Sequence, residues 1–248
     1  MLEVRNLCKS FGGIHVTRNV SFTLEAGERR VVLGPNGAGK TTLFNLLAGT
    51  LKPTSGDILL EGKSISRLSA SQRARAGISR SYQKNNLFQD LTFRENLMLA
   101  AAAGAGHTSA LFRDSFQDKR LKEIADEVAE QVALTDLLDR PVASASYGNR
   151  RQLEVGLALA TKPRLLLMDE PTSGVGPSMI DGFHHLLQRL PRELTVVIIE
   201  HDLDLAFDVA DRITVLNYGE VVFEGTPEET RGNQIVRDIY LGSWQADA

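Results

Sequence analysis

Three short runs of consecutive hydrophobic residues stand out along the chain. They predict buried strands at Arg30–Leu33, Leu165–Met168 and Thr195–Ile199. A continuous apolar run fits a strand that helices cover on both faces of a parallel sheet. The pattern therefore predicts an α/β fold with a mainly parallel sheet.

A second pattern, in which hydrophobic and polar residues alternate, precedes the first of these runs. Val20, Phe22 and Leu24 alternate with polar neighbours, which predicts half-solvated strands in residues 2–33. Such strands are typical of an antiparallel layer at the edge of a core. The same reasoning predicts a strand at Ile58–Leu60 and, near the end of the chain, a hairpin with strands at Ile213–Leu216 and Val221–Phe223 and a turn at Asn217–Glu220.

Helical spacing dominates the middle of the chain. Hydrophobic residues recur there on one helical face, which predicts core packing by Leu121, Ile124, Ala125, Val128 and Val132. Other helices are predicted at 40–48 and 68–76, after the capping boxes Thr92–Glu95 and Thr226–Glu229, near Pro177 and from about Asp202. The prediction is one domain over residues 1–248, with a core at about 1–84 and 161–248 and an inserted helical subdomain at about 85–160.

The residues between the first buried strand and the helix at 40–48 form a full phosphate-binding loop. It reads Gly-Pro-Asn-Gly-Ala-Gly-Lys-Thr from Gly34 to Thr41. Glycines let backbone N–H groups turn inward around phosphate oxygens, and the helix N-terminus adds the positive end of its dipole. Lys40 is predicted to hold the β- and γ-phosphates and the Thr41 hydroxyl to ligate Mg²⁺, with ATP as the nucleotide. The predicted phosphate-binding set is Gly34, Pro35, Asn36, Gly37, Ala38, Gly39, Lys40, Thr41 and Thr42.

Two carboxylates end the hydrophobic run at 165–168. Residues at the carboxyl end of a strand lie where α/β sheets place their ligands. Asp169 is expected to hold Mg²⁺ through water, and Glu170 to take the proton of an attacking water or to orient that water.

Composition narrows the classes of function. The chain has 248 residues, 42% of them hydrophobic and 24% charged, as expected of a soluble globular protein. Its net charge of −3 does not suggest a nucleic-acid partner. We expect no membrane span and no signal peptide, because no stretch approaches the necessary apolar length. Cys8 is the only cysteine, so an intrachain disulfide is impossible and a reducing cytoplasm is the simplest location.

The segment from Ala145 to Glu154 resembles the signature Leu-Ser-Gly-Gly-Gln of the nucleotide-binding subunits of ABC transporters. Ser146 and Gly148 match it, Asn149 replaces the glutamine, and Tyr147 stands at the first glycine. The resemblance implies that two subunits pair head to tail, so that the signature of one contacts the γ-phosphate held by the other. A plain helix cap by Ser146 or Asn149 is the alternative, and both readings are compatible.

Further residues take roles only through this resemblance. Gln83 matches the glutamine that senses Mg²⁺ and water and adjoins the membrane partner, and His201 matches the switch histidine near the γ-phosphate. Phe11 matches the aromatic ring that stacks on adenine, with Val16 completing the pocket; the alternative for Phe11 is a core side chain. The implied catalytic set is Glu170, His201 and Gln83, and the implied metal set is Thr41, Gln83 and Asp169. No site role is assigned to His15, His107, His184 or His185.

One departure and three short similarities refine the resemblance. Gly176 stands where the family has an aspartate or asparagine that bonds across the dimer, which puts the role of that loop in doubt. Ser146-Tyr-Gly148, Ile199-Glu-His-Asp202 and Tyr240-Leu-Gly242 are similar to the importer subunits for branched-chain and other hydrophobic amino acids.

The resemblance implies an ATP hydrolase at the cytoplasmic face of the inner membrane, peripheral to its permease subunits and indirectly linked to an extracytoplasmic solute-binding protein. The ATPase pair is either a homodimer or a heterodimer with a paralogue. Lipopolysaccharide export and urea uptake are alternative tasks. A soluble ABC ATPase acting on nucleic acid or the ribosome is less favoured, since those proteins usually carry two cassettes or a long coiled-coil insertion. The signature and His201 argue against a phosphate-loop kinase.

Overall fold

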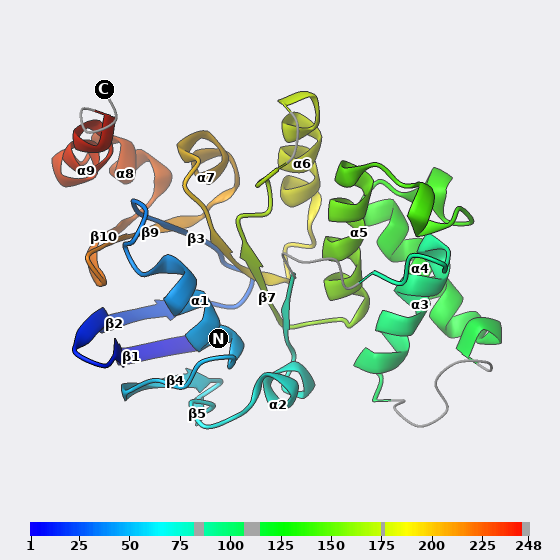
Figure 1. The fold of residues 1–248 in the computed structure, drawn as a ribbon, viewed down its shortest axis with the longest axis horizontal. Helices are drawn as coiled ribbons and strands as arrows, with labels where there is room; N and C mark the ends of the chain where they lie inside the picture. The colour runs from blue at the N-terminus through cyan, green and yellow to red at the C-terminus, as the bar shows by residue number, and fades with distance from the viewer. Residues whose placement is uncertain (82–86, 107–114, 175–176, 245–248) are drawn as a thin grey trace. The chain divides into compact units, whose positions relative to one another are not determined.

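The computed structural model describes residues 1–81, 87–106, 115–174 and 177–244 (Figure 1). The chain divides into two compact units. The first unit comprises Met1–Arg73, Leu167–Glu170 and Arg192–Ala248, and the second comprises Ala74–Leu166 and Pro171–Pro191. The described residues of the predicted helical subdomain all belong to the second unit.

An antiparallel sheet forms one layer of the first unit. Its strands follow the order β2-β1-β4-β5, with bounds β1 Leu2–Phe11, β2 Ile14–Leu24, β4 Ser55–Leu60 and β5 Lys63–Ser64. Val4 lies opposite both Phe22 and Ile58, and all three side chains are buried. The alternating pattern at Val20, Phe22 and Leu24 therefore predicted the buried face of this sheet correctly.

A larger, mainly parallel sheet forms the second layer of this unit. The order runs β10-β9-β3-β8-β7 through the unit, with bounds β3 Arg29–Leu33, β7 Leu165–Asp169, β8 Thr195–Ile199, β9 Arg212–Asn217 and β10 Glu220–Gly225. β3 pairs in parallel with β8 and β9, and β10 pairs antiparallel with β9. Every residue of β3, β7 and β8 is buried, which confirms the predictions made from continuous apolar runs.

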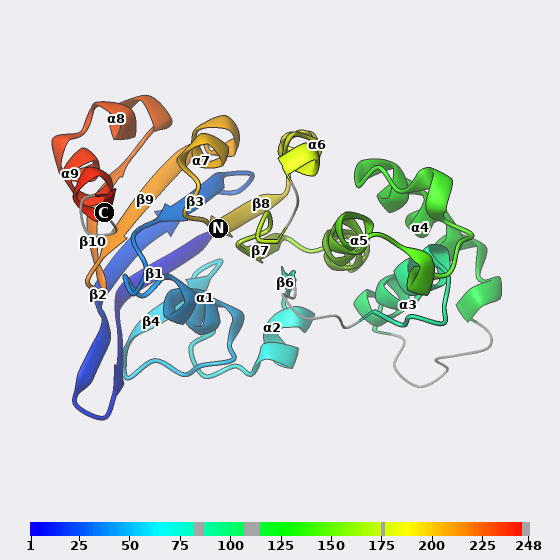
Figure 2. The same cartoon turned by 45° about the horizontal axis from the view of Figure 1, so that its top comes forward.

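Helices cover this sheet on both faces (Figures 1 and 2). α1 (Lys40–Ala48) contacts β2 of one sheet and β8 of the other, so it lies between the two layers. On the other face, α7 (Leu203–Val209) packs against β3, and α8 (Pro227–Gly232) packs against β9 and β10. α9 (Gln234–Trp244) follows α8 and contacts it and β10. The capping box of Thr226 and Glu229 is complete and begins α8, as predicted.

The second unit is mainly helical. Its three central helices pack against one another in pairs: α3 (Phe93–Gly104), α4 (Lys119–Gln131) and α5 (Tyr147–Ala160). Both halves of the Thr92–Glu95 capping box are formed, and Leu121, Ala125 and Val128 of the predicted stripe are buried. The remaining elements are α2 (Ala70–Arg75), β6 (Ile78–Arg80), α6 (Pro177–Arg189) and 3₁₀ turns at Ser115–Gln117, Thr135–Leu137 and Val142–Ser144. In the part of the chain that the structure describes, no helix is both long and apolar enough to cross a membrane.

The helix predicted at 68–76 is wrong at its start. Leu68 N–H donates to Ile65 O and lies in a turn, and α2 begins only at Ala70. Ser69 precedes the helix, and its hydroxyl accepts a hydrogen bond from Gln72 N at 3.4 Å. The polar side chain of Ser69 thus sets the helix start, as N-cap serines commonly do.

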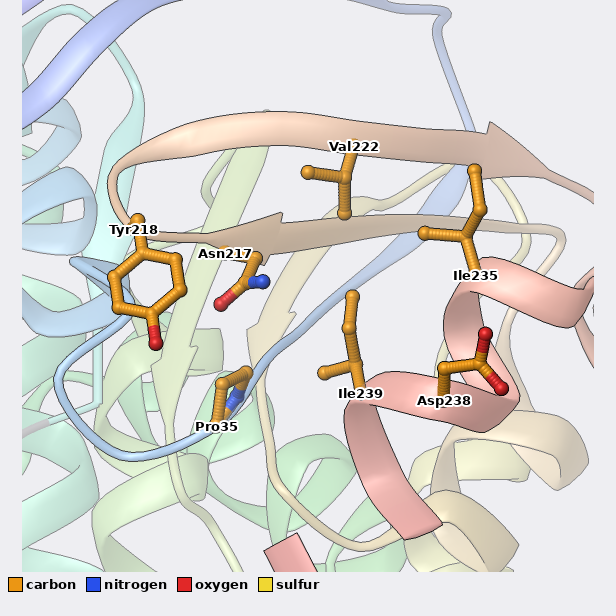
Figure 3. Close-up of a pocket in the computed structure, with 7 residues that line it drawn as sticks. All are labelled: Pro35, Asn217, Tyr218, Val222, Ile235, Asp238 and Ile239. Carbon is orange, nitrogen blue, oxygen red and sulfur yellow. The ribbon is translucent and has the colours of Figure 1, made fainter. Parts of the chain in front are cut away.

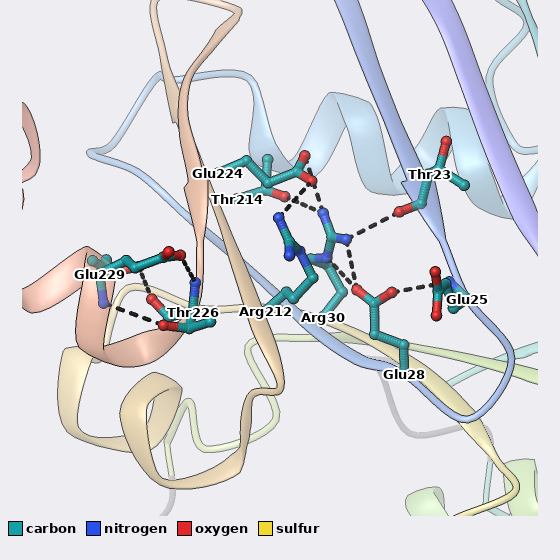
Figure 4. A network of polar contacts seen from close by, with 10 residues as sticks. Thr23, Glu25, Glu28, Arg30, Arg212, Thr214, Glu224, Thr226 and Glu229 are labelled. Carbon is teal, nitrogen blue, oxygen red and sulfur yellow. Dashed lines mark hydrogen bonds and ion pairs between the residues drawn. The ribbon is translucent and has the colours of Figure 1, made fainter.

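A buried ion-pair network holds the amino-terminal end of β3 (Figure 4). The guanidinium of Arg30, which is 1% exposed, pairs with Glu28 at 2.6 Å and with Glu224 at 3.1 Å. It also donates to Thr214 Oγ1 at 2.9 Å and to Thr23 O at 3.0 Å. Arg30 thereby connects β2, β3, β9 and β10 at the end of β3 opposite to the phosphate-binding loop.

Candidate functional site

The phosphate-binding loop leaves the carboxyl end of β3 in a conformation that requires glycine. Gly34, Gly37 and Gly39 all have positive φ, at 155°, 81° and 99°. A side chain at Gly34 would also place its Cβ 2.3 Å from Leu216 O, and one at Gly39 would come within 2.7 Å of Val16 O. Neighbouring strands therefore enclose the loop so closely that only glycine fits at these two positions.

The hairpin of β9 and β10 supports the loop from the side. Its two-residue turn, Tyr218–Gly219, has positive φ at both residues, as a tight hairpin turn requires. Gly219 N donates to Ala38 O at 3.0 Å, and Arg18 N donates to Gly219 O at 2.7 Å. The turn thus ties the loop to β2.

An open pocket of about 510 Å³ lies beside the loop at Pro35 (Figure 3). The hairpin and α9 form its walls, and its other lining residues are Asn217, Tyr218, Val222, Ile235, Asp238 and Ile239. Tyr240 of α9 approaches the loop: the main chain of Gly34 lies close enough to its buried hydroxyl to lower the pKa of the phenol. Burial is the larger effect and raises the pKa of Tyr240 to about 12. Tyr240 thus brings α9 near the first residue of the loop.

Lys40 joins the loop to the acidic residues around it. Its ammonium, in a residue that is 7% exposed, donates to Gly34 O at 2.6 Å and to Pro35 O at 3.1 Å. Burial lowers the pKa of Lys40, and the charges of Glu170, Asp169 and Glu200 act against that shift. Lys40 thus lies within electrostatic reach of the carboxylates at the carboxyl ends of β7 and β8.

The amino terminus of α1 is suited to an anion. No side chain caps the first turn of this fully described helix, and the turn contains no acidic residue. Its N–H groups and the positive end of its dipole are therefore not matched by a carboxylate of the chain. Thr41 is exposed and Thr42 half-buried at this end. The glycine loop, Lys40 and this helix end together fit the phosphates of a nucleotide.

Glu170 and His201 meet at the carboxyl ends of β7 and β8. Glu170 has the left-handed φ of 44°, uncommon for a residue with a side chain, and its N–H donates to Ile199 O at 2.8 Å. His201 Nδ1 lies 3.6 Å from Glu170 Oε1 and 3.7 Å from Oε2 of the fully buried Glu200. Strain of this kind is found at functional sites, where the surrounding structure holds it in place.

The donor atoms for Mg²⁺ are few. Asp169 is 7% exposed at the end of β7, and Thr41 offers a hydroxyl. Among the described residues, no group of three or more histidine, cysteine or acidic side chains could hold a metal ion. This donor set fits Mg²⁺, because Mg²⁺ commonly takes one or two protein oxygens and completes its shell with phosphate oxygens and water.

The two residues predicted to contact adenine lie on the strands of the first hairpin. Phe11 is 47% exposed, so the alternative that it belongs to the core is wrong. The Lys9 ammonium lies 5.0 Å from the centroid of its ring. Val16 is half-buried, and its carbonyl faces Gly39 of the loop. The adenine contact itself stays a prediction.

The signature residues begin α5 in the second unit. Ser146 is the N-cap of this helix, and its hydroxyl accepts a hydrogen bond from Asn149 N at 3.2 Å. The helix-cap reading is therefore correct, and it leaves the exposed Ser146 at a helix amino terminus. Tyr147 is 57% exposed, and its hydroxyl donates to Ser173 O at 3.2 Å.

Comparison with known proteins decides the family. A model of the family described as "ABC transporter" matches residues 17–173, more than half of the chain. The chain belongs to the ABC transporter family. It is an ATP-binding subunit of that family and couples ATP hydrolysis to transport.

Several ABC transporter ATPases are similar to the chain over nearly their whole length. The high-affinity branched-chain amino acid transport ATP-binding protein BraF of Pseudomonas aeruginosa is 38% identical over 252 residues, covering 98% of each chain. The corresponding protein LivG of Escherichia coli is 36% identical over 249 residues, with the same coverage. The lipopolysaccharide export system ATP-binding protein LptB of Haemophilus influenzae is 33% identical over 243 residues, covering 98% of this chain and 97% of its own.

Solved ABC cassettes share the fold. The ADP conformation of an ABC transporter cassette superposes with a TM-score of 0.85 at 28% identity, covering 98% of each chain. A dimeric bacterial ABC transporter cassette gives a TM-score of 0.76 at 25% identity, covering 92% of this chain and 99% of its own. The α/β architecture predicted from the sequence, that of an ABC ATPase, is thereby confirmed.

The predicted site residues of this ABC ATPase fall into three groups. The loop, Asp169, Glu170 and His201 come together in the first unit, with Phe11 and Val16 on its hairpin. The signature, Ser146–Asn149, belongs to the second unit. Gln83 and Gly176 lie outside the described residues.

Sequence reasoning missed three residues that contact the site. Arg151 donates to the main-chain oxygen of Pro171, which follows Glu170. Tyr240 lies near the main chain of Gly34, and Glu200 lies beside His201. Tyr240 belongs to the segment Tyr240-Leu-Gly242, which in the sequence served only as a similarity to amino-acid importer subunits. The spacing of Arg151 and Glu154 along one helix could have indicated an ion pair.

Proposed function

We propose that this chain is the ATP-hydrolysing subunit of an importer for branched-chain amino acids. The observation that carries the proposal is the meeting of the phosphate-binding loop, Lys40, Glu170 and His201 at one edge of a sheet. The full-length similarity to BraF, at 38% identity, supports the choice of cargo.

Each residue of the site has a role in this proposal. The loop from Gly34 to Thr42 and the ammonium of Lys40 bind the phosphates. Thr41, Asp169 and Gln83 hold Mg²⁺, which neutralises phosphate charge when bound. Glu170 accepts the proton of the attacking water or orients it.

Two contacts complete the nucleotide site. His201 is proposed to bond the γ-phosphate, and its distance of 3.6 Å from the Glu170 carboxylate supports a response to the state of Glu170. Phe11 stacks on the adenine and Val16 lines the same pocket, which fixes the nucleotide at its other end.

The proposal requires a second ATPase subunit and membrane partners. Ser146, Tyr147, Gly148 and Asn149 are proposed to contact the nucleotide of a second copy or of a paralogue, and the solved dimeric cassette supports pairing of this kind. The pair would dock on permease subunits near Gln83, at the cytoplasmic face of the inner membrane. An extracytoplasmic solute-binding protein would deliver the amino acid.

Uptake of labelled leucine, isoleucine and valine by whole cells tests the proposal. Deletion of the gene, with redundant importers removed, is expected to abolish high-affinity uptake, and the wild-type gene to restore it. Lys40→Ala is expected to leave the defect in place while the subunit still appears in the membrane fraction. Lys63→Ala, which removes an exposed lysine of β5, is the matched control and should restore uptake. Normal uptake of all three amino acids in the deletion strain would refute the cargo assignment.

Lipopolysaccharide export is the second candidate, because LptB of Haemophilus influenzae is 33% identical over nearly the same length. If the deletion leaves amino-acid uptake intact and causes lipopolysaccharide to accumulate in the inner membrane, this second function replaces the first. The assignment of the ATPase site is common to both.

A further inference from the structure

Two side chains on the first turns of α5 hold the chain that follows Glu170. Tyr147 Oη donates to Ser173 O at 3.2 Å, and Arg151 Nε donates to Pro171 O at 3.0 Å. Tyr147 and Arg151 are four residues apart, so they lie on the same face of the helix. We call these two residues and the segment Pro171–Gly174 the α5 brace. All of its residues belong to the second unit.

Arg151 is fixed within the brace. It is 4% exposed, and its Nη1 atom lies 2.7 Å from Oε2 of Glu154, one turn further along α5. Burial raises the pKa of Glu154, and the charge of Arg151 opposes that rise. The Glu154 carboxylate fixes the orientation of the Arg151 guanidinium. The Nε–H of Arg151 therefore points in one direction, toward Pro171 O.

Gly174 makes room for the tyrosine. Its φ is +76°, and a Cβ there would lie 2.9 Å from Tyr147 Oη. The tyrosine ring thus occupies the space in which a side chain at position 174 would lie. This contact depends on the residue that departs from the family signature, because a glycine at position 147 would have no hydroxyl to reach Ser173.

We propose that Tyr147 and Arg151 are positioning residues that couple the signature to Glu170 of the same chain through main-chain carbonyls. The inference rests on the proposed function. Tyr147 belongs to the signature, and Pro171 directly follows Glu170, so the brace runs from the signature to the residue next to the proposed base. When the signature contacts the nucleotide held by the partner, α5 shifts. The brace passes this shift to Glu170, the proposed base of the same chain as the signature. This link needs no acidic or amide side chain at Gly176.

Tyr147→Phe tests the brace, because it removes one hydroxyl from an exposed ring and leaves the cap of α5 intact. Loss of one hydrogen bond is expected to lower kcat about two- to tenfold. KM for ATP should stay nearly unchanged and the Hill coefficient should fall toward one. In the nucleotide-free protein, amide hydrogen exchange in residues 172–174 should become faster. Ser64→Ala, which removes the hydroxyl that donates to Asp57 Oδ1 at 2.6 Å on β5, outside the proposed site, is the matched control for the loss of one hydrogen bond.

A second variant approaches the same contact from the other side. Gly174→Ala places a methyl group against the Tyr147 hydroxyl, and it should reproduce the loss of kcat and the faster exchange. Wild-type kcat, cooperativity and exchange in Tyr147→Phe would overturn the inference. That result is distinguishable from failure of the proposed function. A wrong cargo would appear as normal amino-acid uptake in the deletion strain, and a wrong ATPase site as normal ATP turnover in Glu170→Gln.

Discussion

Replacement of Arg30 by methionine tests whether the ion-pair network at the start of β3 holds the core together. The change removes the guanidinium that Glu28, Glu224, Thr214 and Thr23 O all contact, and it keeps an unbranched side chain in place of the aliphatic stem. Removing one partner of a buried ion pair costs about 3–5 kcal/mol, because the other charge is left buried and unpaired.

The partners that remain decide where in this range the cost falls. Glu224 still pairs with Arg212 at 3.4 Å and is partly exposed. The loss of Arg30 therefore costs little free energy at Glu224. Glu28 is 9% exposed, and its carboxylate keeps the hydrogen bond from the N–H of Glu25 at 2.9 Å but loses its cation. One unpaired carboxylate therefore dominates, and we expect a loss of about 3–4 kcal/mol in the free energy of unfolding.

Urea unfolding followed by far-ultraviolet circular dichroism measures this loss. With a slope of about 2–3 kcal/mol per molar urea, the midpoint should fall by roughly 1–2 M. The double variant Arg30→Met with Glu28→Gln should recover part of the loss, because it removes the stranded charge. Arg5→Met, which breaks the exposed pair with Glu3, is the control and should leave the midpoint unchanged. A loss below about 1 kcal/mol for Arg30→Met would refute the reasoning.

Three further predictions concern the site. Glu170→Gln protein should run as a dimer in light scattering with ATP and mostly as a monomer with ADP, which lacks the bridging phosphate; equal monomer fractions would contradict pairing of two copies. His201→Ala should lower kcat about 10²-fold or more while ATP affinity is kept, as measured by steady-state kinetics and equilibrium binding, and an unchanged kcat would argue against the γ-phosphate contact. Because burial raises the pKa of Tyr240 from 10.0 to about 12, the stability that its neutral phenol contributes is present below pH 10 and is lost as the pH rises from 10 to about 12. Tyr240→Phe should remove the ionisation step near pH 12 from an ultraviolet titration, and persistence of that step would show that it belongs to another group.

Local patterns predicted most of the strands and helices because each carries its own signal. Thr195–Ile199 was placed to the residue by an unbroken apolar run, and the capping boxes at Thr92 and Thr226 fixed two helix starts. The start of α2 was misplaced because Leu68 continues the hydrophobic pattern of the helix. In the structure, Leu68 belongs to the preceding turn, and the helix begins only after Ser69.

Contacts between residues far apart in the sequence could not be predicted in this way. The pairing of Arg30 with Glu224 depends on which strands lie side by side, and Arg30 reads along the chain only as the polar start of a strand. The bond from Tyr147 to Ser173 ends on a main-chain carbonyl, whose direction depends on the φ and ψ of the loop. The sequence shows that Tyr147 replaces a glycine of the family signature. Only the fold shows that this tyrosine contacts Ser173.

The rate of ATP hydrolysis by purified Glu170→Gln tests most directly whether the end of β7 carries the hydrolytic site. The substitution keeps the size of the side chain and removes the base. ATP binding should therefore survive while turnover falls by about 10²–10⁴-fold. Lys40→Ala should instead weaken ATP binding itself, because a phosphate loses its charged partner. Turnover by Glu170→Gln close to that of the unaltered protein would contradict the assignment.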